Sequence, residues 1–355
     1  MTGSHLPFDY EAWAESVVRG TDRRCAYDGA TGPAFAAWRA AFRDELRDAL
    51  GFPAIRRAGR SDLDPRRHET TSVRRASAAH ERQTWSVETE PGVRVPFHLL
   101  LPASADPPYP VVVALHGHTE SGKDLAVGAV DDDEGRRCVE EERRDFARQA
   151  VERGFAALAP DLRGFGELST HAETETSDET GSKPCVRWQK TAQLVGRSLV
   201  GERVWDARRL AAFVERREEL DADRLALVGH SGGGTTALFA AALDKRFAPV
   251  VPCASVCRFE DALVPREHCL CNYVPGLRRL GEAGDVAGLV APRPLRVVAG
   301  EDDPLFPVAG TRRAFETLRA AYRGADAADA CSLFVGDGGH RFYPNGVWPF
   351  VERHL

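Results

Sequence analysis

The sequence lacks the features that would place a protein in a membrane or send it out of the cell. No segment approaches the ~18 uninterrupted apolar residues that a membrane-spanning helix needs. The first twenty residues, MTGSHLPFDYEAWAESVVRG, contain no continuous apolar stretch of the kind found in a secretory signal. We therefore expect no contact with a membrane and a cytoplasmic location.

The sequence also lacks a long uninterrupted run of charges of one sign. The formal net charge is −6, and acidic and basic residues are mixed along the chain. Because nucleic-acid-binding proteins gather lysine and arginine on one face, this pattern argues against a nucleic-acid partner. The 355 residues, 43% of them hydrophobic, are enough for one large α/β unit with additions or for two domains.

The eight cysteines lack the regular spacing of a metal site or a disulfide framework. They are scattered along a chain without a secretory signal, which favours reduced thiols. The densest group, PCASVCRFEDALVPREHCLC over residues 252–271, has C-x₃-C and C-x-C spacing instead of the paired C-x-x-C of zinc sites. His116 and His118 have no nearby third ligand in the sequence. We predict no metal and no cofactor, and interpret the cysteines as buried free thiols.

The sequence pattern changes near residue 80. Residues 8–20 and 34–51 repeat apolar residues at helical spacing, whereas the Arg-rich segment 56–77 has no period and is interpreted as a connection. We predict an N-terminal helical extension over residues 1–80, packed on a catalytic domain over residues 81–355. Two β-like runs separated by PGV, at 84–90 and 94–102, predict a hairpin at a sheet edge.

Short apolar runs then alternate with helical patterns. The runs lie at 109–117, 154–164, 224–229, 248–255, 294–303 and 331–340, and helical patterns lie at 140–154, 198–218, 232–244 and 308–324. Uniformly apolar short strands separated by helices predict an α/β fold with a mostly parallel sheet of about eight strands, covered on both faces. The polar, aperiodic segment 166–185 predicts a long loop at the active site.

One stretch, LALVGHSGGGTTALFAAALD, places a serine where a predicted strand turns into a predicted helix. Gly229-His230-Ser231-Gly232-Gly233 matches the G-x-S-x-G nucleophile elbow, in which glycines let strand and helix approach closely and the serine is held in a strained conformation. A glycine-rich turn with serine as a helix N-cap is the alternative. The strand before and the helix after the motif favour a catalytic Ser231.

A nucleophilic serine needs a base and an orienting acid, in the chain order Ser, acid, His. The predicted strand at 294–300 is followed by EDDPLFP, and the strand at 331–336 is followed by DGGHRFY. We predict Asp303 as the acid, preferred to Asp302 because of its place in a G-x-x-D-x-x-x-P loop, and His340 as the base. A turn acid and a loop histidine are the alternatives for the two residues taken singly.

An acyl-transfer site also needs donors for an oxyanion. The backbone N–H of Gly232 follows the nucleophile directly, and His118 in VVVALHGHTESGKD follows an earlier strand, so we predict these two N–H groups as the oxyanion hole. His116, His230 and Arg163 are candidates for contact with substrate. For Arg163, a buried salt bridge that braces the PDLRGFGE loop is the favoured alternative.

Together, ALHGHTESGKD, APDLRGFGE, GHSGGGTTALFAAALD, CLCNYVPGL, APRPLRVVAGEDDPLFP and GDGGHRFY resemble the dienelactone-hydrolase-like and acetyl-xylan-esterase-like branch of the α/β-hydrolase superfamily. The resemblance runs from about residue 80 to the end of the chain. It implies an esterase that uses a Ser-His-Asp triad, needs no cofactor and acts on a small-molecule ester. True dienelactone hydrolases have a cysteine nucleophile where this chain has Ser231, so the resemblance does not imply lactone opening.

Two other functions stay open at the level of sequence. Oligopeptidase-like serine hydrolases share GHSGGG-like elbows, although they carry a large additional domain for which this chain has too few residues. A non-catalytic α/β-hydrolase that only binds small molecules would retain the fold, but such proteins usually lose one member of the triad. Neither the natural substrate nor the oligomeric state follows from the sequence.

Overall fold

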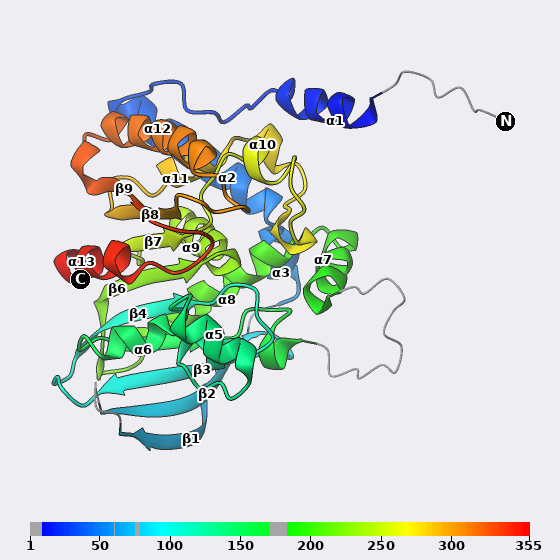
Figure 1. Ribbon diagram of the computed structural model, residues 1–355. Helices are drawn as coiled ribbons and strands as arrows, with labels where there is room; N and C mark the ends of the chain where they lie inside the picture. Colours follow the sequence, from blue (N-terminus) through cyan, green and yellow to red (C-terminus); the bar gives the residue numbers. More distant parts are fainter. Residues whose placement is uncertain (1–8, 60, 75–78, 170–182) are drawn as a thin grey trace.

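The computed structural model describes residues 9–59, 61–74, 79–169 and 183–355, and these form one twisted sheet with helices on both faces (Figure 1). The strand order is β1-β2-β3-β5-β4-β6-β7-β8-β9. The pairs β1–β2, β2–β3 and β3–β5 are antiparallel, and every other neighbouring pair is parallel. The strands are β1 (Arg66–Val73), β2 (His80–Glu90), β3 (Val93–Pro102), β4 (Tyr109–Leu115), β5 (Ala156–Pro160), β6 (Leu220–His230), β7 (Val250–Cys253), β8 (Leu295–Gly300) and β9 (Cys331–Gly336).

Helices occupy most of the connections between the strands. The α-helices are α1 (Tyr10–Arg19), α2 (Gly32–Ala49), α3 (Phe52–Arg57), α4 (Lys123–Ala126), α5 (Asp133–Glu140), α6 (Phe146–Val151), α7 (Pro184–Leu194), α8 (Leu199–Val214), α9 (Gly232–Leu243), α10 (Phe259–Ala262), α11 (Ala283–Gly288), α12 (Val308–Gly324) and α13 (Pro344–His354). Short 3₁₀ turns are η1 (Gly166–Leu168), η2 (Leu270–Asn272), η3 (Leu277–Arg279) and η4 (Ala328–Ala330).

The central strands are apolar on both sides because both faces of the sheet are buried. In β4, Val111 and Val113 pack with α8, α9, α11 and α12 on one face, whereas Val112 and Ala114 pack with α6 and α13 on the other. Side chains alternate between the faces along a strand, so a strand covered twice reads as a continuous apolar run. The mostly parallel, doubly covered sheet predicted from the sequence is therefore confirmed.

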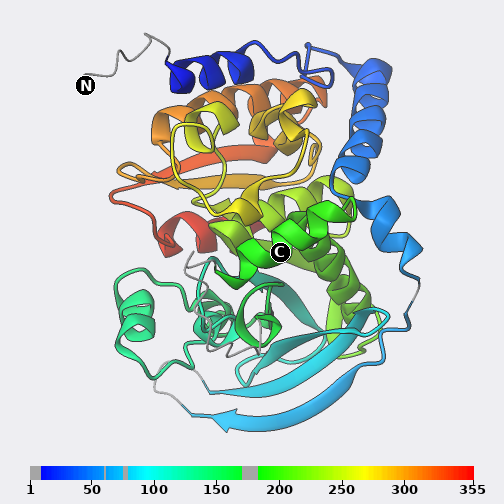
Figure 2. The same cartoon turned by 90° about the vertical axis from the view of Figure 1, so that its right-hand side faces the viewer.

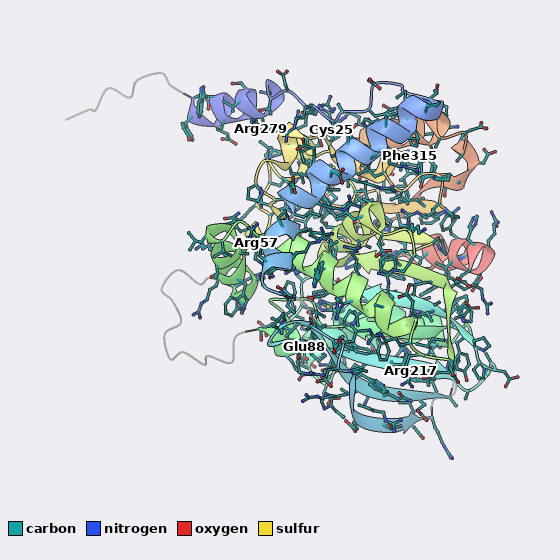
Figure 3. All side chains as sticks on the ribbon, turned by 180° about the vertical axis from the view of Figure 1, so that it is seen from behind. Cys25, Arg57, Glu88, Arg217, Arg279 and Phe315 are labelled. Carbon is teal, nitrogen blue, oxygen red and sulfur yellow. The ribbon has the colours of Figure 1, made fainter. Side chains whose placement is uncertain are left out.

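The N-terminal helices extend the layer that contains α8 and α9. Phe42 and Leu46 of α2 are fully buried in the same core cluster as those helices, and Gly51, with a φ of 85°, separates α2 from α3. Seen from behind, α2 runs along this layer, and Cys25 lies near Arg279 (Figure 3). The backbone N–H of Cys25 donates to the carbonyl of Leu280 at 2.8 Å, which fixes the segment between α1 and α2 to the main body.

Among the described residues the sheet has nine strands where about eight were predicted. The segment 56–77, interpreted as a connection, contains the additional one. Arg66–Val73 forms β1 and pairs with β2 at the edge of the sheet. Most of its side chains are exposed on both faces. An edge strand with no buried face has no apolar alternation, so the sequence pattern could not reveal it.

Two other predicted segments differ in detail. Of the helix predicted over 140–154, only α6 (Phe146–Val151) forms, because Arg143 has a φ of 58° that is incompatible with a right-handed helix, and α5 ends at Glu140. The loop predicted over 166–185 begins with η1 and ends in the first turn of α7, while residues 170–182 lie outside the described residues. Within the described ranges, none of the helices has the length and apolar character required to cross a bilayer.

Candidate active site

Ser231 stands at the junction of β6 and α9 in a conformation that few non-glycine residues adopt. Its φ of 54° and ψ of −122° lie outside the regions favoured by L-residues. The backbone N–H of Ser231 donates to the carbonyl of Cys253 at 2.9 Å, and Thr235 N–H donates to the Ser231 carbonyl at 2.9 Å. These bonds hold the strained turn from both sides. The sequence context therefore produces the strained strand-to-helix turn that the G-x-S-x-G motif requires, while the nucleophilic role of Ser231 stays a prediction.

Close packing explains the two outer glycines of the motif. A Cβ atom on Gly229 would lie 2.3 Å from the carbonyl oxygen of Gly233, and one on Gly233 would lie 1.9 Å from that of Leu115. Real Cβ atoms do not approach backbone oxygens so closely. Glycine at both positions is what allows α9 to start directly against β6 and β4.

Asp303 and His340 meet although they follow different strands. His340 Nδ1 lies 2.8 Å from Asp303 Oδ2, and the other carboxylate oxygen, Oδ1, accepts the backbone N–H groups of Leu305 and Phe306 at 2.9 and 3.0 Å. Only 4% of Asp303 is exposed, so burial and three hydrogen bonds fix the carboxylate. With the Nδ1 proton donated to Asp303, the Nε2 atom of His340 is the one free to accept a proton.

The neighbouring acid is placed differently. Asp302 is exposed, and its backbone N–H donates to the carbonyl of Gly338 at 2.9 Å. This geometry favours Asp303 as the partner of His340. The His340 ring lies 5.0 Å from the ring of His230, the residue directly before Ser231, and stacks at 5.8 Å on Phe306.

The two residues predicted to form the oxyanion hole are neighbours. A Cβ atom on Gly232 would lie 3.2 Å from Nδ1 of His118. In the part of the chain that the structure describes, the backbone N–H groups of Gly232 and His118 donate to no protein acceptor. Two free N–H groups beside a candidate nucleophile are what a developing oxyanion requires.

His116 and Arg163 are both buried and hydrogen-bonded within the protein. His116 Nδ1 donates to the Gly117 carbonyl at 2.7 Å, and its Nε2 accepts the N–H of Leu162 at 3.1 Å. Burial lowers the pKa of His116 to about 4, so the ring is neutral. Arg163 binds both carboxylate oxygens of Asp206 at 2.7 Å. This geometry favours bracing roles, and contact of either residue with substrate stays a prediction.

His230 is fully buried, and neither ring nitrogen has a hydrogen-bond partner among the described residues. Burial, followed by the charges of Arg144, His340 and His118, lowers its pKa well below 6.5. A neutral ring without partners acts here as packing behind the elbow. A role for His230 in binding substrate stays a prediction.

A small cavity lies near the candidate site, although none of Ser231, Asp303 and His340 is among its lining residues. It has a volume of about 20 Å³, and its lining includes Thr235, Ser255, Asn272 and Phe306. Phe306 is the residue stacked on His340, and Asn272 Oδ1 would lie 3.8 Å from a Cβ atom on Gly232. The oxygens of the Ser255 and Asn272 side chains lack partners within the described chain. The space holds roughly one water molecule or a group of similar size.

The structure also assembles side chains that the sequence analysis did not connect. His118, Cys185, Cys269 and Cys271 come from three separate segments, and their Nε2 or Sγ atoms lie within 4.8 Å of one another. Burial lowers the pKa of His118, but hydrogen bonds with Cys269 and Cys271 outweigh it and raise this pKa to about 9. The sequence held no sign of the cluster because its members are up to 153 residues apart.

A family model described as the alpha/beta hydrolase fold matches residues 110–267. With the sheet order and the turn at Ser231, this match shows that the chain has the α/β-hydrolase fold. The resemblance stated from the sequence motifs is thereby confirmed for the fold.

Individual relatives agree with this class. The chain is 26% identical over 287 residues to the "Putative hydrolase YtaP" of Bacillus subtilis (strain 168), an alignment that spans 79% of this chain and 89% of that protein. A "putative acetyl xylan esterase" from Bacteroides fragilis superposes with a TM-score of 0.73 at 15% identity, covering 95% of this chain and 84% of its own. A glucuronoyl esterase from Solibacter usitatus superposes with a TM-score of 0.64 at 17% identity, covering 94% and 96%. These likenesses agree with the α/β-hydrolase fold of this chain.

Proposed function

We propose that this chain is a serine esterase that hydrolyses a small carboxylic ester through an acyl-enzyme intermediate. The observation that carries the proposal is the placement of three groups. Ser231 is held at a strained elbow after β6, and Asp303 and His340, which follow β8 and β9 of the same parallel sheet, are hydrogen-bonded to each other.

The chemistry follows from the proton positions. Asp303 accepts the Nδ1 proton of His340, which leaves Nε2 to take the Ser231 hydroxyl proton as that oxygen attacks the ester carbonyl. The oxyanion of the tetrahedral intermediate would accept from the N–H groups of Gly232 and His118. His340 then protonates the departing alcohol, and an attacking water repeats the cycle to release the acid.

The comparisons support an ester of sugar type as the first substrate class to consider. The solved structures of similar fold include proteins named acetyl xylan esterase and glucuronoyl esterase. Acetylated sugars are therefore the first natural substrates to test, with p-nitrophenyl acetate as the model substrate.

The assignment of the acid is tested by a matched pair of variants. Asp303→Asn should reduce kcat for p-nitrophenyl acetate by about 10⁴-fold, because the His340 ring loses the partner that fixes its tautomer. Asp302→Asn, one residue away and exposed, should retain activity within about twofold because nothing in the mechanism uses its carboxylate. Circular dichroism of both variants checks their folding. A large loss in Asp302→Asn with an active Asp303→Asn would reverse the assignment.

A further inference from the structure

The cluster of His118, Cys185, Cys269 and Cys271 lies outside the proposed triad and has its own chemistry. His118 belongs to the loop after β4, Cys185 to the first turn of α7, and the other two cysteines to η2 and the residue before it. Figure 2 looks onto the side of the molecule where α7 lies next to the segment that carries η2. Three parts of the chain thus converge on one point.

The separations match those of ligands around a single ion. His118 Nε2 lies 3.1 Å from Cys271 Sγ, Cys185 Sγ lies 3.3 Å from Cys269 Sγ, and all four atoms are within 4.8 Å of one another. In a tetrahedral zinc site with bonds of ~2.3 Å to sulfur and ~2.0 Å to nitrogen, neighbouring ligand atoms are about 3.5–3.8 Å apart. The four side chains already have nearly this arrangement.

A buried arginine next to the cluster supplies an independent observation. Arg203 of α8 is 1% exposed, and its Nη1 lies 3.5 Å from Cys271 Sγ, while Nε and Nη2 donate to the Arg163 carbonyl. Within the described residues, Arg203 forms no ion pair with a carboxylate. A buried guanidinium needs a negative partner, and a dication bound by three thiolates carries a net charge of −1.

We propose that His118 Nε2 and the Sγ atoms of Cys185, Cys269 and Cys271 bind one Zn²⁺ ion, with Arg203 balancing the charge of the complex. Thiolate ligands select a soft cation, and the Cys₃His set is one that zinc occupies in structural sites. With four protein ligands the coordination sphere is closed, so the ion would hold the structure together and would not activate water.

The position of the site gives it a consequence for the proposed esterase. His118 contributes its side chain to the ion and its backbone N–H to the predicted oxyanion hole, and the Gly232 backbone lies beside its ring. Zinc would therefore tie the oxyanion loop to α7 and η2. The metal site itself does not depend on the esterase proposal, since the ligands are separate from Ser231, Asp303 and His340.

The test is the metal content of the purified full-length protein, measured by elemental analysis and native mass spectrometry. We expect one zinc ion per chain that survives dialysis against a weak chelator. Cys269→Ser and Cys271→Ser should each lower zinc retention by at least about tenfold. Cys331→Ser, which changes a buried cysteine outside the cluster, and Ser231→Ala should both retain zinc as the wild type does.

Replacing the zinc ion of the wild-type protein with Co²⁺ tests the proposal even if a cysteine variant fails to fold. The wild-type protein should take up one Co²⁺ and show the intense visible and thiolate charge-transfer bands of a tetrahedral sulfur-rich site. Folded wild-type protein that takes up neither zinc nor Co²⁺ would overturn the proposal. Its cysteines would then be free thiols, or Cys185 and Cys269 would form a disulfide, which mass spectrometry detects as a mass lower by two hydrogens. Full zinc content in both cluster variants would overturn it as well, because the ion would then lie elsewhere.

Discussion

At the scale of single residues, the elbow depends on the absence of side chains as much as on the hydroxyl of Ser231. A serine with a φ of 54° is strained, and that cost is tolerated only because strand and helix pack tightly around it. Among the glycines of the elbow, Gly233 has the least room, since a Cβ atom there would lie 1.9 Å from the carbonyl oxygen of Leu115 at the end of β4. Local strain and close packing are therefore two aspects of one structural feature.

Gly233→Ala should consequently lower the free energy of unfolding by about 3 kcal/mol or more, because the new methyl would lie 1.9 Å from the carbonyl oxygen of Leu115 and backbone must move to accommodate it. Urea unfolding followed by circular dichroism measures the change. Gly20→Ala at the end of α1, where the nearest atom would be 3.2 Å away, is the control and should change stability by less than about 1 kcal/mol. Equal stability of Gly233→Ala and the wild type would contradict the packing argument.

At the scale of elements, buried charges join the loop after β5 to the helices and strands around it. Arg163 pairs with Asp206 of α8 at 2.7 Å and with Glu90 of β2 at 2.8 Å. Asp161, in the same loop, accepts the backbone N–H groups of Lys123 and Glu167. This network fixes the loop whose Phe165 ring contacts the ring of His118.

Asp206→Asn should destabilise the protein by about 2 kcal/mol, because the buried Arg163 guanidinium loses a bidentate carboxylate partner. The remaining ion pair of Arg163 with Glu90 at 2.8 Å limits the loss. Differential scanning calorimetry would show the lowered unfolding temperature. Asp44→Asn removes an exposed ion pair with Arg47 in α2 and should change stability by less than about 0.5 kcal/mol. Similar effects of the two substitutions would argue against a special role for the buried network.

Sequence patterns predicted those elements whose burial imposes a period. The strands at 109–117 and 224–229 are predictable because both of their faces are apolar, and the helix at 232–244 because its sequence has an alanine-rich helical pattern. β1 was missed because an exposed edge strand needs no apolar side chains. The same reasoning brought Asp303 and His340 to one edge of the sheet, since the carboxyl ends of parallel strands lie together.

The cysteine cluster was beyond such reasoning. Its residues lie on a loop, a helix and a 3₁₀ turn, and only the packing of α7 against η2 brings them together. Local spacing identifies metal sites whose ligands are close in sequence, as in C-x-x-C motifs, and here Cys185 and Cys269 are 84 residues apart. A site assembled from distant segments becomes visible only in the folded structure.

At the scale of the whole molecule, stability should depend on pH through the buried histidine behind the elbow. The pKa of His230 is well below 6.5 in the folded protein, chiefly because of burial, so the unfolded chain binds more protons between pH 6.5 and the folded pKa. The contribution of neutral His230 to the free energy of unfolding is fully present above pH 6.5 and is lost as the pH falls toward the folded-state pKa. From this group alone, the slope of the unfolding free energy should approach about 1.4 kcal/mol per pH unit.

The measurement is urea unfolding at several pH values between about 7 and 5, for the wild type and for His230→Leu, which removes the titrating ring. In His230→Leu, the slope of the unfolding free energy against pH should fall by most of the amount that one titrating proton contributes. His68→Leu, on the exposed edge strand, is the matched control and should keep the slope of the wild type. If His230→Leu had the same pH slope as the wild type, a group other than His230 would be responsible.

The central claim, that Ser231 is the nucleophile of an esterase, is tested most directly by labelling the intact protein with a fluorophosphonate and locating the label by mass spectrometry. We predict that the label is on Ser231, and that Ser231→Ala is not labelled and loses about 10³-fold or more of its turnover of p-nitrophenyl acetate while remaining folded. A label on another residue, or folded wild-type protein with neither label nor turnover, would contradict the account.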